Sequence, residues 1–161
     1  MRRALSICLL LLLSLPATAG RHQLLIVSGL GGTTAYGEQF TGLATRLAQA
    51  ARDAGVASEQ IVTLSASANA AGARADRDTV LAAISRAAET LGEDDRFFLV
   101  MFGHGNPRGD GAVFNLPGPD LTATELAAAL EAFGERLVIV VNTASSSGPF
   151  VAPLAAPNRV V

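Results

Sequence analysis

The stretch Phe97-Phe98-Leu99-Val100-Met101-Phe102-Gly103-His104-Gly105 is an unbroken apolar run that ends at a histidine between two glycines. Such a run, bounded by turn-forming residues, is typical of a strand buried on both faces in a parallel sheet covered by helices. His104 then follows the carboxyl end of that strand, where open α/β sheets hold their ligand sites. The glycines allow a sharp turn and the close approach of another group. Taken alone, the histidine also fits an ordinary loop residue.

Strand and helix patterns alternate on both sides of this stretch. Buried strands are predicted at 23–28, 61–64, 96–102 and 137–141. Apolar residues at helical spacing predict helices at 37–54, 76–91 and 122–133, the last two with capping residues at Asp76 and at the Thr122 to Glu125 capping box. This order predicts an α/β fold: a three-layer α/β/α sandwich around a mostly parallel sheet.

Three segments fall outside this alternation. Residues 65–75, rich in Ala, Ser and Gly, are predicted as a flexible loop or peripheral ornament. Residues 104–121 contain four glycines and three prolines and are predicted as a functional loop. Arg159-Val160-Val161 has the pattern of a strand that is cut off, so we expect the domain at 20–161 to be incomplete at its C-terminus.

Residues 1–19 have the pattern of a secretory signal peptide: Arg2 and Arg3, an apolar run, and a small-residue site that predicts cleavage after Ala19. The run is too short and weakly flanked for a membrane span, so we expect no membrane association after cleavage. The remainder, 20–161, is predicted to be a single domain. The protein is therefore expected to be exported, to the periplasm or the extracellular space.

Composition excludes several kinds of chemistry. The chain has no lysine, which rules out a lysine base or Schiff base, and its single cysteine, Cys8, lies in the leader. Without the leader, ten basic residues face 14 acidic ones, a formal net charge of −4 with no basic stripe. We therefore expect no nucleic-acid partner. No histidines or carboxylates have metal-ligand spacing, so neither a metal nor another cofactor is predicted.

Two strand ends carry the candidate chemistry. In a parallel sheet, His104 after one strand and residues 142–148 after the next would emerge side by side. Nucleophilic catalysis needs this combination of a hydroxyl, an imidazole and backbone N–H groups that hold an oxyanion. Spacing does not decide among Ser145, Ser146 and Ser147, and a serine cluster is also ordinary turn chemistry. Asp110 and Asp120 could orient the imidazole, although aspartates are common in turns.

The pairing of a strand ending in Gly-His-Gly with a later strand ending in Ala144-Ser145-Ser146-Ser147-Gly148 resembles the caspase-like superfamily of cysteine peptidases, most closely its legumain branch. The resemblance places His104 and Gly105 on the family's His-Gly pair and Ser145 on the catalytic cysteine. It also implies a caspase-like fold, with the Gly105 and Ser145 amides as the oxyanion hole.

The replacement of cysteine by serine is the main departure from the family. A thiolate forms readily near neutral pH, whereas a serine hydroxyl needs an adjacent, well-oriented base. The resemblance therefore implies an inactive peptidase-like domain that binds a peptide or partner protein, or a weak serine-variant hydrolase of acyl or peptide bonds. Gly31, Tyr36 and Ser146 are predicted to contact the substrate. The alternative is a non-catalytic α/β module that binds a small ligand, peptide or protein.

Overall fold

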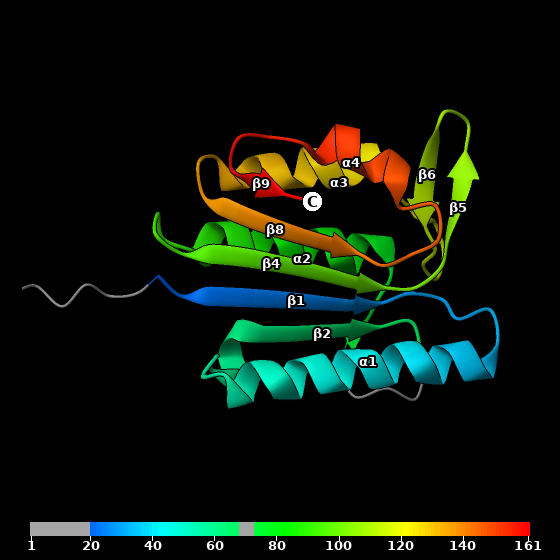
Figure 1. Ribbon diagram of the computed structural model, residues 1–161, viewed down its shortest axis with the longest axis horizontal. Helices are drawn as coiled ribbons and strands as arrows, with labels where there is room; N and C mark the ends of the chain where they lie inside the picture. The colour runs from blue at the N-terminus through cyan, green and yellow to red at the C-terminus, as the bar shows by residue number, and fades with distance from the viewer. Residues whose placement is uncertain (1–19, 68–72) are drawn as a thin grey trace, which may run out of the picture.

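The computed structural model describes residues 20–67 and 73–161, and the predicted leader at 1–19 lies outside this part (Figure 1). Its centre is a six-stranded sheet of order β3-β2-β1-β4-β8-β9, and every neighbouring pair is parallel. Helices pack on both faces, which confirms the predicted three-layer α/β/α architecture. The strands are β1 (His22–Ser28), β2 (Ile61–Ser65), β3 (Ala73–Arg74), β4 (Arg96–Phe102), β8 (Leu137–Asn142) and β9 (Arg159–Val160).

In residues 20–67 and 73–161, four α-helices and two 3-10 turns connect the strands. Three of the helices were predicted, and their caps form as the sequence indicates: Asp76 accepts a bond from the Thr79 N–H at 2.9 Å, and Thr122 and Glu125 make the reciprocal capping box. The bounds are α1 (Thr34–Asp53), η1 (Ser58–Gln60), α2 (Arg77–Thr90), α3 (Ala123–Leu130), η2 (Glu131–Phe133) and α4 (Gly148–Leu154).

Two predicted loops contain regular structure. The segment after His104 forms most of an antiparallel sheet, β5 (Gly105–Arg108), β6 (Gly111–Phe114) and β7 (Leu121–Thr122). In the segment after β2, the short strand β3 pairs with Leu64 and Ser65, and the rest of the predicted loop lies partly outside the described residues. The expected strand near the chain end is present as β9, paired with β8.

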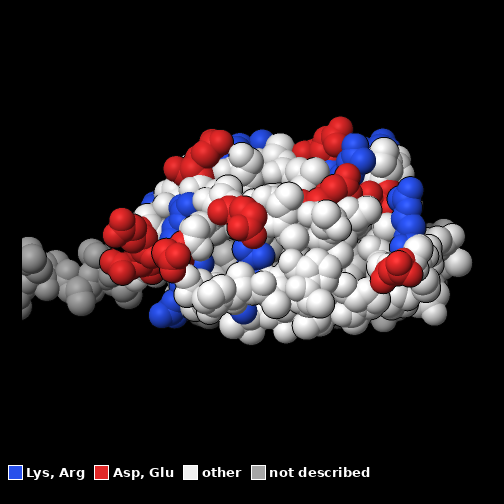
Figure 2. All heavy atoms as spheres, turned by 90° about the horizontal axis from the view of Figure 1, so that it is seen from above, with Lys and Arg blue, Asp and Glu red and all other residues white. Residues whose placement is uncertain are grey.

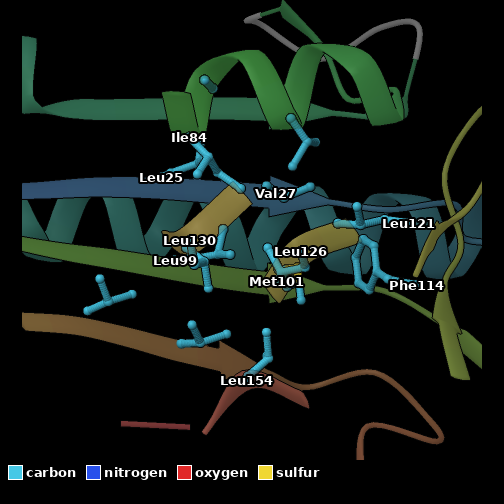
Figure 3. Close-up of a cluster of buried hydrophobic side chains, with 14 of the residues drawn as sticks. Leu25, Val27, Ile84, Leu99, Met101, Phe114, Leu121, Leu126, Leu130 and Leu154 are labelled. Atoms are coloured by element: carbon cyan, nitrogen blue, oxygen red, sulfur yellow. The ribbon is translucent and has the colours of Figure 1, made fainter. Parts of the chain in front are cut away.

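On the far face of the sheet in Figure 1, α2 and α3 pass behind the strands. Leu25, Val27, Leu99 and Met101 point from β1 and β4 into this layer, where they meet Ile84, Leu126 and Leu130 (Figure 3). These side chains are at most 2% exposed. Their burial makes this layer the main hydrophobic core.

The near face is covered in part. Leu24, Ile26 and Val100 pack against Ala44 and Ala48 of α1, but no helix passes in front of β4 or β8 in Figure 1. Apolar side chains on β8 and β9 consequently remain exposed: Leu137 36%, Val141 43% and Val160 56%. In Figure 2, which looks down on Figure 1 from above, charges of both signs are interspersed and most atoms along the lower border, the near face, are uncharged.

Within the described part of the chain, no helix combines the length and apolar content needed to cross a membrane.

Candidate functional site

The ends of β4 and β8 lie side by side, as the parallel sheet predicts. Met101 is paired with Asn142 in the register, and both the N–H and the hydroxyl of Thr143 donate to the Met101 carbonyl, at 3.0 and 2.9 Å. These bonds hold the start of the Ser-rich turn against the end of β4. His104 and the serine turn therefore belong to one edge of the sheet.

Gly105 is the point of closest approach between the two segments. A Cβ atom at this position would clash with the Ser145 carbonyl oxygen, would lie 2.8 Å from the Val113 carbonyl oxygen and would touch Ala144. Only glycine leaves room for the serine turn here. The structure thus places Gly105, the residue after His104, directly against Ala144 and Ser145.

A second glycine contact fixes the turn before His104. A Cβ on Gly103 would lie 2.7 Å from the Phe114 ring and 3.3 Å from the Cα atom of Gly29. The His104 carbonyl accepts a bond from the Asn115 N–H at 3.0 Å, which begins the β5–β6 pairing. The Gly-His-Gly sequence is therefore needed where β1, β4 and the small sheet converge.

The His104 ring lies against two aromatic residues of α1. The centroid distances are 4.9 Å to Tyr36 and 5.1 Å to Phe40, with interplanar angles of 81° and 75°. Tyr36 and Phe40 are stacked on each other at 6.0 Å. Residues four apart share one face of a helix, so α1 presents both rings to the imidazole. Tyr36 was predicted at the site, whereas Phe40 was one of the apolar residues at helical spacing from which the helix at 37–54 was predicted.

The serine turn contains two unusual features. Ser146 has a φ of +57°, the one non-glycine residue of the described chain in the left-handed region. The side-chain oxygen of Asn142 accepts from the Ala144 N–H at 3.1 Å, while its amide nitrogen is buried without a partner among the described residues. Ser145 is exposed, and Ser146 and Ser147 are half-buried. The sequence analysis included Asn142 only as part of the turn at 142–148 and gave it no role of its own.

The aspartates suggested as orienting groups are placed elsewhere. Asp120 accepts a bond from the Leu116 N–H at 3.1 Å, within its own loop. Asp110 is exposed at the tip of the β5–β6 hairpin. Among the described residues, no side chain forms a hydrogen bond or an ion pair with the His104 ring, so the site has no Ser-His-Asp arrangement.

Gly31 lies at the same edge of the sheet but lines a cleft that is separate from the His104 and Ser145 contacts. A cleft of about 780 Å³ is bordered by Gly31, Thr33, Glu38, Thr41, Arg46 and Ser67, among other residues. Thr41 lies about 100° around α1 from Phe40, because each helical residue turns the chain by that angle. The cleft therefore opens on a different side of α1 from the rings that contact His104.

Three carboxylates away from this edge have lowered pKa values. Hydrogen bonds from Thr79, Gly92 and Thr122 lower the pKa values of Asp76, Asp95 and Glu125 respectively. All three carboxylates hold the ends of helices or loops. In the described residues, no cluster of three His, Cys, Asp or Glu side chains could hold a metal ion.

The chain is similar to a solved structure. The chain aligns with the crystal structure of protein GSU0716 from Geobacter sulfurreducens with a TM-score of 0.59 and 26% sequence identity, over 77% of this chain and 50% of that one. This chain thus spans about half the length of that protein. No family model matches the chain. No curated protein matches it either.

Proposed function

We propose that the edge formed by His104, Gly105 and Ser145 is a caspase- or legumain-like peptidase site in which serine replaces the catalytic cysteine. The site would bind a peptide or a partner protein, with hydrolysis slow or absent. The observation that carries the proposal is the close approach of Gly105 to Ser145, which brings the residue after the histidine against the residue at the cysteine position.

The surroundings of His104 favour the inactive form of this proposal. For hydrolysis, the Ser145 Oγ would attack the peptide carbonyl and pass its proton to His104, while backbone N–H groups would hold the oxyanion. His104 would then protonate the leaving amine, and water would release the acyl group. A serine triad also has a carboxylate that hydrogen-bonds to the histidine and stabilises its protonated form, and no such group bonds to His104 in the described chain.

Restoring the thiol tests the inherited geometry. We expect Ser145→Cys, in a chain that also carries Cys8→Ser, to react with iodoacetamide at least about tenfold faster than an ordinary exposed cysteine, because a nearby imidazole favours the thiolate. Ser58→Cys, at an exposed serine of η1, is the matched control. The added change His104→Ala should return the rate to that of the control. Equal rates for Ser145→Cys and Ser58→Cys would exclude the proposal.

A fluorophosphonate distinguishes the active form from the inactive one. The inactive form predicts little labelling of the unmodified protein. Labelling that disappears in both Ser145→Ala and His104→Ala would instead establish a serine hydrolase.

The second candidate is a small-ligand binding module, and the cleft beside Gly31 favours it. A volume of about 780 Å³ lies within the range of ligand sites, and hydroxyl groups of Thr33, Thr41 and Ser67 line it. This reading predicts that Ser145→Cys is unreactive while substitutions in the cleft, such as Thr41→Val, weaken binding of a ligand found by thermal-shift screening.

A further inference from the structure

The contacts of His104 differ from those of an imidazole held by a polar partner. Its ring is half-buried, and the groups packed against it are the Tyr36 and Phe40 rings. Both meet the imidazole nearly at right angles, which is the favourable arrangement for aromatic pairs. The orientation of the imidazole is therefore set by ring packing in the described structure.

The start of α1 holds these two rings in place. Thr33 caps the helix by accepting a bond from the Tyr36 N–H at 3.4 Å, and the Gly37 N–H donates to the Thr33 carbonyl at 3.1 Å. The Phe40 carbonyl accepts a bond from the buried Ser28 hydroxyl at 3.3 Å, at the end of β1. The first two turns of α1 are thus fixed to the same sheet edge as His104.

We propose that Tyr36 and Phe40 are positioning residues that orient His104 toward Ser145, in the role that a carboxylate fills in a serine triad. The proposal rests on the function proposed above and assigns the orienting element to helix α1. Within residues 20–67 and 73–161, neither ring nitrogen of His104 has a hydrogen-bond partner, so packing against the two rings leaves both available for a proton and for a bound partner. Tyr36 is 48% exposed, so this side of the ring pair is open to solvent.

The test uses the reactive Ser145→Cys protein with Cys8→Ser. Phe40→Leu and Tyr36→Leu are each expected to slow alkylation on the order of tenfold and to change its pH profile, because a freely rotating imidazole is a poorer proton acceptor. The conservative changes Phe40→Tyr and Tyr36→Phe keep the rings and should preserve the rate. Phe98→Leu is the matched control, since Phe98 makes a similar edge contact, at 5.7 Å, with the distant His22.

Histidine NMR signals show whether each substitution acts on its own pair, since the chain has two histidines. Phe40→Leu should shift the ring signals of His104, and Phe98→Leu those of His22. Unchanged alkylation and an unchanged pH profile in Phe40→Leu and Tyr36→Leu, with Ser145→Cys still reactive, would overturn the positioning role alone. A Ser145→Cys protein no more reactive than Ser58→Cys would overturn the proposed function, and the positioning role with it.

Discussion

On its far face the six-stranded sheet is closed by α2 and α3, whereas on its near face α1 covers β1 and β2 and leaves parts of β4 and β8 open (Figure 1). Both faces are apolar, as expected for parallel strands. The far face buries Phe97, Leu99 and Val138 to 1% exposure or less, while Val141 on the near face is 43% exposed. The far layer therefore supplies most of the packing energy, and the near layer supplies the helix that contacts His104.

The largest expected effect is the loss of stability caused by a core substitution in β4. It is compared with a substitution on the open face of the sheet. Leu99→Ala removes a fully buried side chain and should lower the free energy of unfolding by about 3 kcal/mol. Val141→Ala removes methyl groups that solvent already reaches, so its effect should stay within about 0.5 kcal/mol. Urea denaturation followed by circular dichroism measures both. Comparable losses for the two variants would show that the near face is covered in solution.

A smaller effect is expected from the arginine that joins the far-face helices. The Arg136 guanidinium donates to the carbonyls of Ala88 and Leu91 at the end of α2, and to those of Ala132 and Phe133 in η2. Arg136→Ala leaves these carbonyls without the cation and should cost about 2 kcal/mol.

Two substitutions make this prediction specific. Arg136→Lys keeps the charge but loses the planar fork, so we expect it to recover part of the loss. Arg52→Ala, on α1, should change the free energy of unfolding by less than about 0.5 kcal/mol, because the Arg52 guanidinium bonds to the exposed Gln49 and to no other described residue. An Arg136→Ala protein as stable as Arg52→Ala would show that the helix ends do not depend on this side chain.

The sequence was sufficient to predict the strands and helices of the far layer, because hydrophobic periodicity and helix-capping residues agree there. The apolar runs at β4 and β8, the Asp76 cap and the capping box at Thr122 and Glu125 each point to one structure. The small sheet was missed since β5, Gly105-Asn106-Pro107-Arg108, contains a proline and a glycine and has no alternating pattern. Helix α4 was missed because it contains Pro149 and Pro153.

The sequence was enough to predict which strand ends form the candidate site. It was not enough to predict which side chains contact each other there. Parallel topology alone brings His104 and Ser145 to one edge of the sheet. The contact of Phe40 with His104 depends on how far α1 extends past the strands, and helical periodicity assigns that residue equally well to the core. The positions of Asp110 and Asp120 depend on the small sheet, so their suggested role could not be judged before that sheet was known.

The smallest expected effect concerns Asp95, which ties the start of β1 to the end of α2. Its carboxylate accepts bonds from the Gly92 N–H at 2.9 Å, from the Arg21 N–H at 2.6 Å and from the Arg21 guanidinium. The bond from the Gly92 backbone, followed by the Arg21 contacts, outweighs desolvation and lowers the pKa of Asp95 below its ordinary value of 3.8. The folded protein therefore holds this proton less tightly than the unfolded chain does.

The sign of the pH dependence follows from this difference. The stabilisation is fully present above the unfolded pKa and is lost as the pH falls from about 4 through the lower folded value. Asp95→Asn should be less stable than the parent protein at pH 7, and the gap should narrow as the pH is lowered toward 3. Urea unfolding at a series of pH values measures the gap, and Asp94→Asn, at an exposed neighbour, is the control. If the difference in free energy of unfolding between the two proteins stays constant from pH 7 to pH 3, ionised Asp95 stabilises the protein no more than protonated Asp95 does. The start of β1 and the end of α2 would then be joined by neutral hydrogen bonds alone.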